Sequence, residues 1–357
     1  MRSLPTAFFL ACAWFWCIGG FFPVLLDHDF GAVAFVVFFI VNVTGAALFG
    51  FVLDAQKRAR FLARFASSAQ LFSVVVIAYH FVFMSWISTL LGSALPLLGF
   101  MAATGLFIAL RYRLISIAIA VFVASLALFA VALSYPAPLA PPAPVASGFI
   151  HYVIPLGLGF LLAPYFDLTF HRAFSASPNP RLSFFIGFAG LFSLLLVGMF
   201  YATPIFTALI TSQGLANPAL KVVLGLLVLQ TGFTTAAHLR ELEGSRWFTM
   251  KFALPTTVTL CLLCGFHLAV ALYAAEFKFA FGDLIYRTLL FIIGVLFPVH
   301  LIFGGMNKRT LIAAAFLAPC YTLGFLIGGA YAPALSIGMA GLAVMMFIWR
   351  TRIFKYN

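Results

Sequence analysis

The chain is dominated by a succession of apolar runs, each close to the length that a helix needs to cross a lipid bilayer. About 20 apolar residues in helical form span the hydrocarbon core. Of the 357 residues, 64% are hydrophobic and 8% are charged, whereas soluble domains carry roughly 25% charged residues. Only helices and closed barrels cross the bilayer, and barrel strands alternate apolar with polar residues. The sequence therefore predicts an all-α, multi-pass protein that forms a single transmembrane domain over 1–357.

Charged loops, prolines and glycines divide these runs into about twelve predicted spans. The first follows Arg2 and resembles a signal peptide, but it lacks a small-x-small cleavage site, so we expect a retained helix. The predicted spans are 5–26, 30–53, 67–92, 94–110, 114–135, 149–170, 182–210, 220–239, 248–275, 284–304, 311–330 and 333–349.

The distribution of basic residues tests this division independently. With the N-terminus in the cytoplasm, the 20 Lys and Arg residues all fall on the cytoplasmic side except Lys221, Lys278 and Arg287. Cytoplasmic loops are enriched in Lys and Arg, and one miscounted helix would invert every later loop. The sequence therefore predicts a cell inner-membrane protein with both termini in the cytoplasm. Topology, rather than nucleic-acid binding, explains the formal charge of +12.

One acidic residue, Asp167, falls inside a predicted span. Carboxylates within the bilayer are costly and usually mark an ion or substrate path. Asp167 also lies four residues before His171 and five before Arg172, where it can pair along the end of a helix. A functional carboxylate and an interfacial one are both compatible with this position.

Glycine and proline interrupt two predicted spans that are separated by four others. In secondary transporters, interruptions at matching places in two halves of the chain point to broken helices around a central site. Glycine and proline also serve packing and kinking in membrane helices. The interruptions are Gly19, Gly20 and Pro23 in the first span and Pro155, Gly157, Gly159 and Pro164 in the sixth.

The sixth span carries a family resemblance. Its segment Gly157-Leu-Gly-Phe-Leu-Leu-Ala-Pro-Tyr-Phe166, followed by His171-Arg172-Ala173, resembles the Gly-rich, Pro-containing, Arg-ending helix of sodium:solute symporters. Those proteins share the leucine-transporter-type fold of the amino acid-polyamine-organocation superfamily. The resemblance implies broken spans one and six within two inverted five-helix repeats and two extra helices. These parts would be 5–135, 149–304 and 311–349.

The same resemblance implies a sodium site beside span eight. In that fold a hydroxyl pair on span eight and carbonyls freed in broken span one hold the ion. The corresponding residues here are Thr234, Thr235 and Ile18. Oxygen ligands suit hard cations, although Thr hydroxyls also bond back to the helix backbone.

The expected function is ion-coupled symport of a small neutral or zwitterionic solute, with Na⁺ or H⁺ as coupling ion and no other cofactor. The scarcity of buried charges favours a ligand that needs few counter-charges. Asn42 is included as a cavity residue, although it can equally join two helices by a hydrogen bond. The residues expected to form the solute site are Trp16, Gly19, Gly20, Asn42, Gly157, Gly159, Phe160, Tyr165 and Asp167.

Two other functions stay open. The segment Gly50-Phe-Val-Leu-Asp54-Ala-Gln-Lys57-Arg58 resembles a cytoplasmic loop motif of the major facilitator superfamily, with Lys57 in place of the second glycine. That superfamily would pair span one with span seven, whereas inverted five-helix repeats pair span one with span six. A non-transporting membrane sensor or assembly protein with a transporter-like bundle is the second alternative.

Catalytic and metal-binding functions are not expected. The chain contains no GxSxG, HExxH or Walker motif, and its eight carboxylates leave little material for metal chemistry. Cys261 and Cys264 form an isolated CxxC that lacks a second pair. The partners expected are therefore the lipid bilayer and a small solute.

Overall fold

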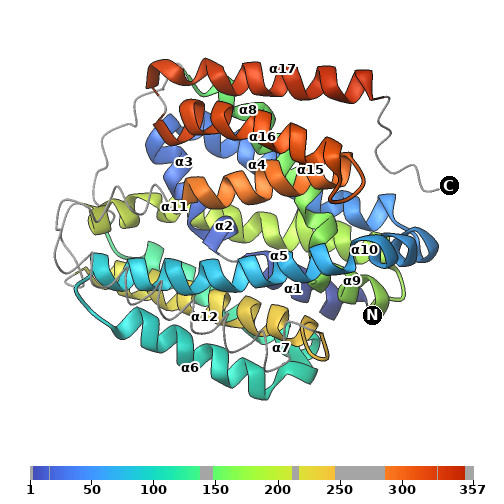
Figure 1. The fold of residues 1–357 in the computed structure, drawn as a ribbon. Helices are drawn as coiled ribbons and strands as arrows, with labels where there is room; N and C mark the ends of the chain where they lie inside the picture. The colour runs from blue at the N-terminus through green and yellow to red at the C-terminus, as the bar shows by residue number, and fades with distance from the viewer. Residues whose placement is uncertain are drawn as a thin grey trace.

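The computed structural model describes residues 3–15, 17–136, 148–210, 217–245, 286–327 and 329–349. Within these ranges every regular element is helical, which confirms the all-α class there (Figure 1). Six helices are long and apolar enough to cross a membrane, and a bent pair adds a seventh crossing if counted as one span. Four shorter helices are also apolar: Ser3–Trp14, Leu95–Ala109, Tyr286–Ile302 and Pro333–Ile348.

These helices support a multi-pass membrane protein, and the number twelve stays a prediction. The predicted span 248–275 lies outside the described residues. In Figure 1 the start of α1, the end of α17 and the connection between α15 and α16 lie at one end of the bundle. The predicted cytoplasmic side corresponds to this end.

The first predicted span consists of three short helices instead of one. They are α1 (Ser3–Trp14), α2 (Cys17–Gly20) and α3 (Phe22–Phe30). Pro23 sits in the first turn of α3, where a missing backbone N–H leaves no helical hydrogen bond unmade. The span is thus interrupted on both sides of Gly19 and Gly20, which lie inside α2.

Four longer helices complete the first half of the chain. They are α4 (Ala32–Val52), α5 (Ala55–Leu90), α6 (Leu95–Ala109) and α7 (Leu114–Leu133), the last preceded by η1 (Arg111–Arg113). Asp54 caps α5 by accepting a 2.7 Å hydrogen bond from the backbone N–H of Lys57. Gly92, at φ 60°, makes the short turn between α5 and α6.

The sixth predicted span is bent sharply. Helix α8 (Ile150–Leu162) passes into the 3₁₀ turn η2 (Ala163–Phe166), and α9 (Leu168–Ala176) then leaves at an angle of 57°. Pro155, Gly157 and Gly159 all lie within continuous α8. The break predicted at these residues lies instead between Pro164 and Asp167.

The following helices cross the bundle and then add its outer layer. Helices α10 (Pro180–Phe185) and α11 (Ser193–Ile210) are joined by the π-helical η3 (Ile186–Phe192) into one span, and α12 (Pro218–Glu241) follows. The helix Tyr286–Ile302 contains η5 (Ile292–Leu296) and α15 (Phe297–Ile302). The chain continues as α16 (Lys308–Tyr321), η6 (Thr322–Ile327), η7 (Gly329–Tyr331) and α17 (Pro333–Ile348).

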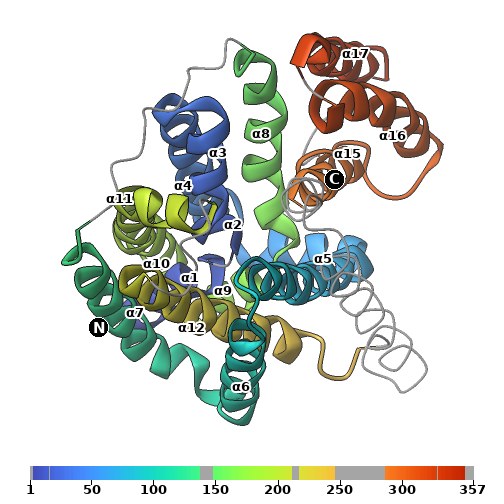
Figure 2. The ribbon, with the colours of Figure 1, turned by 90° about the vertical axis from the view of Figure 1, so that its left-hand side faces the viewer.

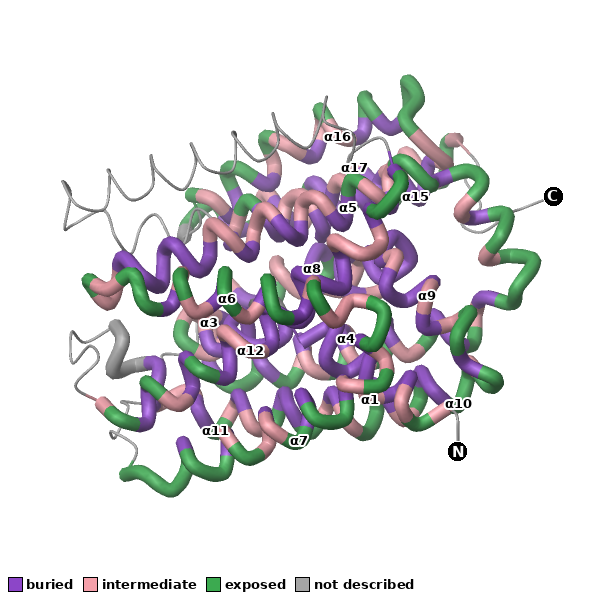
Figure 3. Tube along the Cα trace, turned by 90° about the horizontal axis from the view of Figure 1, so that it is seen from below, coloured by how far each residue is buried: buried purple, intermediate pink, exposed green. Residues whose placement is uncertain are grey.

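Helix α12 lies in the interior and α7 lies near the surface. Of the apolar window of α12, 72% is buried, against 33% for that of α7. Figure 2 shows α6 and α7 on one side of the bundle and α16 and α17 on the other. Figure 3 shows exposed residues along the outer helices and buried ones along the inner helices. The exposed outer faces carry large apolar side chains, as contact with lipid requires.

Two glycines let helices approach closely around α8. A Cβ atom on Gly45 of α4 would lie 2.0 Å from the backbone oxygen of Phe160. A Cβ atom on Gly159 would lie 2.7 Å from the Cα of Gly294 in η5. Small residues at helix crossings are a general device of membrane bundles. Gly159 of α8 thus serves packing rather than unwinding.

Candidate functional site

Helix α12 carries a row of buried polar residues on its inward face. Their spacing along the chain repeats at about one helical turn, so they share one side of the helix. All have fully buried side chains. The row consists of Gln230, Thr231, Thr234, Thr235 and His238.

Asp167 stands at the bend of the sixth span and faces the end of this row. It caps α9, since its Oδ1 accepts hydrogen bonds from the backbone N–H and the hydroxyl of Thr169, both at 2.7 Å. Its other oxygen, Oδ2, has no hydrogen-bond partner among the described residues. The side chain of Asp167 is fully buried.

His238 is the nearest titratable group to this oxygen. Its Nε2 lies 3.9 Å from Asp167 Oδ2, which is longer than a hydrogen bond. Nε2 likewise lacks a hydrogen-bond partner within the described part of the chain. The other ring nitrogen, Nδ1, is 3.0 Å from the hydroxyl of Ser73 on α5, which orients the ring. Two buried titratable side chains therefore face each other across a short gap.

The two threonines of the predicted sodium site face different helices. The Thr234 hydroxyl lies 3.1 Å from the carbonyl oxygen of Cys12 on α1. The Thr235 hydroxyl donates to the carbonyl of Thr231 at 2.7 Å and lies 2.7 Å from Nδ1 of His80 on α5. The hydroxyls thus point to separate partners.

The carbonyl that the structure places beside Thr234 is that of Cys12, and not that of Ile18. Ile18 lies in α2, and its side chain is outside the described residues. Trp16 also lies outside them. Binding of Na⁺ at Thr234 and Thr235 stays a prediction.

Other predicted site residues hold helices together near the bend. Asn42 Oδ1 accepts a 2.7 Å hydrogen bond from the indole N–H of Trp14, which joins α4 to α1. The backbone oxygen of Tyr165 accepts from Nε2 of His171 at 2.8 Å. Phe160 is buried in a cluster of aromatic rings. Asn42 and the backbone oxygen of Tyr165 are therefore hydrogen-bonded to other parts of the protein.

Gly19, Gly20 and Gly157 lie away from the Asp167 site. A Cβ atom on Gly19 would lie 3.0 Å from the Trp14 backbone oxygen, and one on Gly20 would lie 3.1 Å from Leu227. Gly157 has no atom within 4 Å of its Cβ position among the described residues. Of the predicted solute-site residues, the structure brings Tyr165 and Asp167 together at the bend.

An open cavity at the predicted cytoplasmic end leads toward the bend. We call it the inner vestibule; its volume is about 420 Å³. It reaches Leu168, the residue next to Asp167, and its rim carries an ion pair between Arg172 of α9 and Glu241 of α12. The lining residues are Arg58, Leu62, Leu168, His171, Arg172, Ser175, Ala176 and Glu241.

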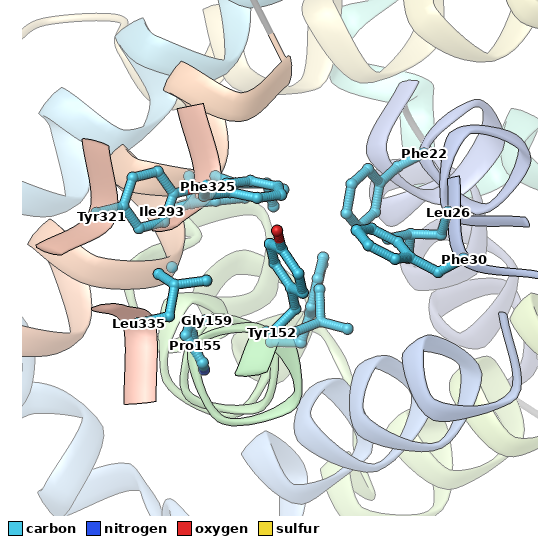
Figure 4. Close-up of a pocket in the computed structure, with 14 residues that line it drawn as sticks. Phe22, Leu26, Phe30, Tyr152, Pro155, Gly159, Ile293, Tyr321, Phe325 and Leu335 are labelled. Atoms are coloured by element: carbon cyan, nitrogen blue, oxygen red, sulfur yellow. The ribbon is translucent and has the colours of Figure 1, made fainter. Parts of the chain in front are cut away.

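The opposite end of the bundle holds a small aromatic cavity that is nearly closed. Figure 4 shows Phe22, Phe30 and Leu26 of α3 facing Tyr152 of α8 and the rings of the C-terminal helices across it. Its volume of about 30 Å³ holds roughly two water molecules. The bundle is therefore hollowed at the predicted cytoplasmic end and packed with aromatic side chains at the opposite end.

A polar link fastens the bundle beside this aromatic cavity. The Tyr286 hydroxyl donates to Asp29 Oδ2 at 2.6 Å. Arg287 lies 3.8 Å from the same oxygen and donates to the backbone oxygen of Phe325 at 2.6 Å. The end of α3 is thus joined to the helix Tyr286–Ile302 and to η6.

Sequence reasoning missed His238, Ser73 and Arg58 as site residues. The signal available for His238 was its place at the end of the polar face of α12, four residues after Thr234. No group of three or more His, Cys, Asp or Glu that could hold a metal ion occurs among the described residues. Comparison with family models, with curated proteins and with solved structures finds no match.

Proposed function

We propose that the protein is a secondary transporter that couples movement of a small solute to a proton exchanged at Asp167 and His238. The observation that carries the proposal is the buried gap of 3.9 Å between Asp167 Oδ2 and His238 Nε2. Buried polar atoms without partners are unfavourable and concentrate where a ligand or proton binds. Carboxylates inside the membrane are typical of proton relays in carriers.

The order of helix contacts supports an inverted-repeat architecture. Helix α1 packs on α7 as α8 packs on η5, which relates spans one and five to spans six and ten. Likewise α1 packs on η3 as α8 packs on α4, which relates spans one and seven to spans six and two. Exchanging each span for the one five positions away in the other half of the chain thus relates these two pairs of contacts, as two five-helix repeats require.

One pairing on its own does not separate the two families that the sequence resembles. Helix α1 contacts α9 of span six and also η3 of span seven. Helix α5 of span three contacts α12 of span eight. These two spans hold equivalent positions in the two proposed repeats. The wider pattern, rather than span one alone, favours five-helix repeats over a major facilitator arrangement.

The bend at Asp167 supplies the moving part of the proposed mechanism. Helix α9 carries Arg172, whose ion pair with Glu241 tethers it to α12 at the rim of the inner vestibule. Rotation of α9 about the bend would change both this tether and the distance between Asp167 and His238. Alternating access in carriers takes this form, with one helix group rocking against another around a central site.

Proton coupling fits the site better than sodium coupling. Asp167 and His238 are both side chains that can bind and release a proton, whereas the hydroxyls of Thr234 and Thr235 are already close to backbone carbonyls. A neutral or zwitterionic small solute stays the expected cargo.

The test is uptake by purified protein in liposomes across a panel of small neutral and zwitterionic solutes. We expect an imposed pH gradient to drive uptake of at least one solute, and Asp167→Asn to abolish it. Asp54→Asn is the matched control because Asp54 also caps a helix but lies exposed in a loop. Uptake that follows only a sodium gradient and survives Asp167→Asn would refute proton coupling. Absence of any uptake, with a stoichiometric co-purifying partner, would favour the sensor alternative.

A further inference from the structure

The inner vestibule contains one cation whose charge no described carboxylate neutralises. At this end of the bundle Glu241 pairs with Arg172, Glu243 pairs with Arg111, and Asp54 pairs with Lys57. Arg58 lines the vestibule and forms no ion pair with a described residue. The cavity therefore presents a net positive wall at Arg58.

The guanidinium of Arg58 is held in place at this wall. Its Nη1 donates to the backbone oxygen of His171 at 3.4 Å. Its central carbon lies 5.8 Å from the ring centre of Phe174, a cation–π distance. Its Nε–H is buried and has no acceptor among the described residues. The guanidinium of Arg58 is thus held in one orientation, and it keeps N–H donors for a ligand.

His171 also lines this cavity, and its ring carries a buried acceptor without a partner among the described residues. The Nε2–H of His171 donates to the backbone oxygen of Tyr165, which leaves Nδ1 as the acceptor of the neutral ring. His171 is 2% exposed, and Nδ1 has no partner within the described chain. A planar guanidinium with an adjacent acceptor suits a solute that carries a carboxylate and a donor group.

We propose that the inner vestibule binds the carboxylate group of a small solute through Arg58. Of the expected neutral or zwitterionic solutes, this inference favours the zwitterionic ones, which carry a carboxylate. Binding at Arg58 is independent of transport, whereas its role in selecting the cargo rests on the proposed function. Leu168 forms part of the same cavity, so a solute bound there lies close to Asp167.

The test is calorimetric titration of the purified full-length protein in phospholipid-free detergent at constant ionic strength. The probes are benzoate and benzamide, which have nearly the same shape and differ in charge. We expect benzoate to bind more tightly than benzamide, and Arg58→Gln to weaken benzoate binding by roughly tenfold or more. Arg58→Lys should restore part of the affinity because it keeps the charge and loses the planar fork.

The matched control is Arg113→Gln, an exposed arginine at the same end of the bundle that lines no described cavity. We expect this variant to bind benzoate like the unchanged protein. Melting of each variant without ligand verifies that it is folded. An unchanged benzoate affinity in folded Arg58→Gln would overturn the proposal.

A second arm separates a soluble carboxylate from a lipid headgroup. The protein is melted in nanodiscs of phosphatidylcholine with and without phosphatidylglycerol. Stabilisation by phosphatidylglycerol that depends on Arg58, without benzoate binding in detergent, would assign the site to lipid and contradict the proposal. Because neither arm uses a gradient, benzoate binding with no uptake in liposomes would refute the transport function and leave the binding site standing.

Discussion

The Oδ2 atom of Asp167 and the Nε2 atom of His238 face each other at 3.9 Å inside the bundle, and neither hydrogen-bonds to a described residue. Asp167 is fixed by its cap on α9, and His238 is fixed by Ser73. A single added proton would convert this gap into a charge-assisted contact with only a small movement. The relationship joins a bent helix to α12, whose apolar window is mostly buried, which makes it suitable for coupling protonation to motion.

Two substitutions of Asp167 separate its role as the cap of α9 from its role as a buried carboxylate. Asn at position 167 keeps an oxygen that can cap α9, because Asn and Asp are equally good N-caps. We therefore expect Asp167→Asn to melt near the unchanged protein and Asp167→Ala to melt lower. Melting of both variants in detergent checks this expectation. Equal destabilisation by Asn and Ala would show that the carboxylate charge, and not the cap, supports the fold.

His238→Gln removes the second titratable group while an amide keeps a hydrogen bond to Ser73 within reach. We expect the pH profile of solute uptake to shift in this variant, because the remaining carboxylate titrates without its imidazole partner. Uptake measured across a pH series checks the prediction. His28→Gln serves as control, since the His28 side chain is 57% exposed. An unchanged pH profile in His238→Gln would assign the coupling to another group.

Gly45→Ala tests the close approach of α4 to α8. The new methyl group would lie 2.0 Å from the backbone oxygen of Phe160, so the two helices must separate. Overpacking of this kind destabilises by about 1–3 kcal/mol. Gly157→Ala is the control because its Cβ position has open space around it in the described structure. Chemical or thermal unfolding should rank Gly45→Ala well below Gly157→Ala, and the reverse order would contradict the observed helix crossing.

The ion pair between Arg172 and Glu241 connects α9 to α12 at the rim of the inner vestibule. A double-mutant cycle with Arg172→Ala and Glu241→Ala should give a coupling of about 0.5–3 kcal/mol, because the pair is partly buried. Unfolding of the two single variants and the double variant measures it. Additive effects of the two substitutions would mean that the tether is absent in solution.

Labelling at the two ends of α7 tests the predicted membrane topology. Ser134 lies at one end and Arg113 precedes the other, and both are exposed. In a variant without the native cysteines, a membrane-impermeant maleimide applied to intact cells should label Ser134→Cys and spare Arg113→Cys. Labelling of Arg113→Cys alone would invert the orientation that the basic loops predict.

Several features of the fold could be predicted from the sequence because the bilayer imposes them. Apolar runs of helical length fixed the all-α class, and the positive charges predicted one basic end, where Arg58, Arg111 and Arg172 lie in the structure. Asp167 stood out as an acidic residue within a span. Its role as the cap of α9 was not predicted.

Other features depend on contacts between distant parts of the chain. The flexibility of Gly159 led to the prediction of a helix break there. In the structure Gly294, far along the sequence, lies against Gly159, which is therefore a packing residue. His238 became a partner of Asp167 only because α12 crosses α9. Arg58 looked like one of several loop cations until the pairing of Lys57 with Asp54 left it without a described carboxylate.

Infrared titration of the Asp167 carboxyl group in lipid tests the central claim most directly, since it requires no knowledge of the solute. We expect a protonated-carboxyl C=O band that loses intensity as the pH rises, disappears in Asp167→Asn and shifts its titration midpoint in His238→Gln. A titrating band that is unchanged in both variants, or no pH-dependent carboxyl band at all, would contradict a shared proton between these two residues.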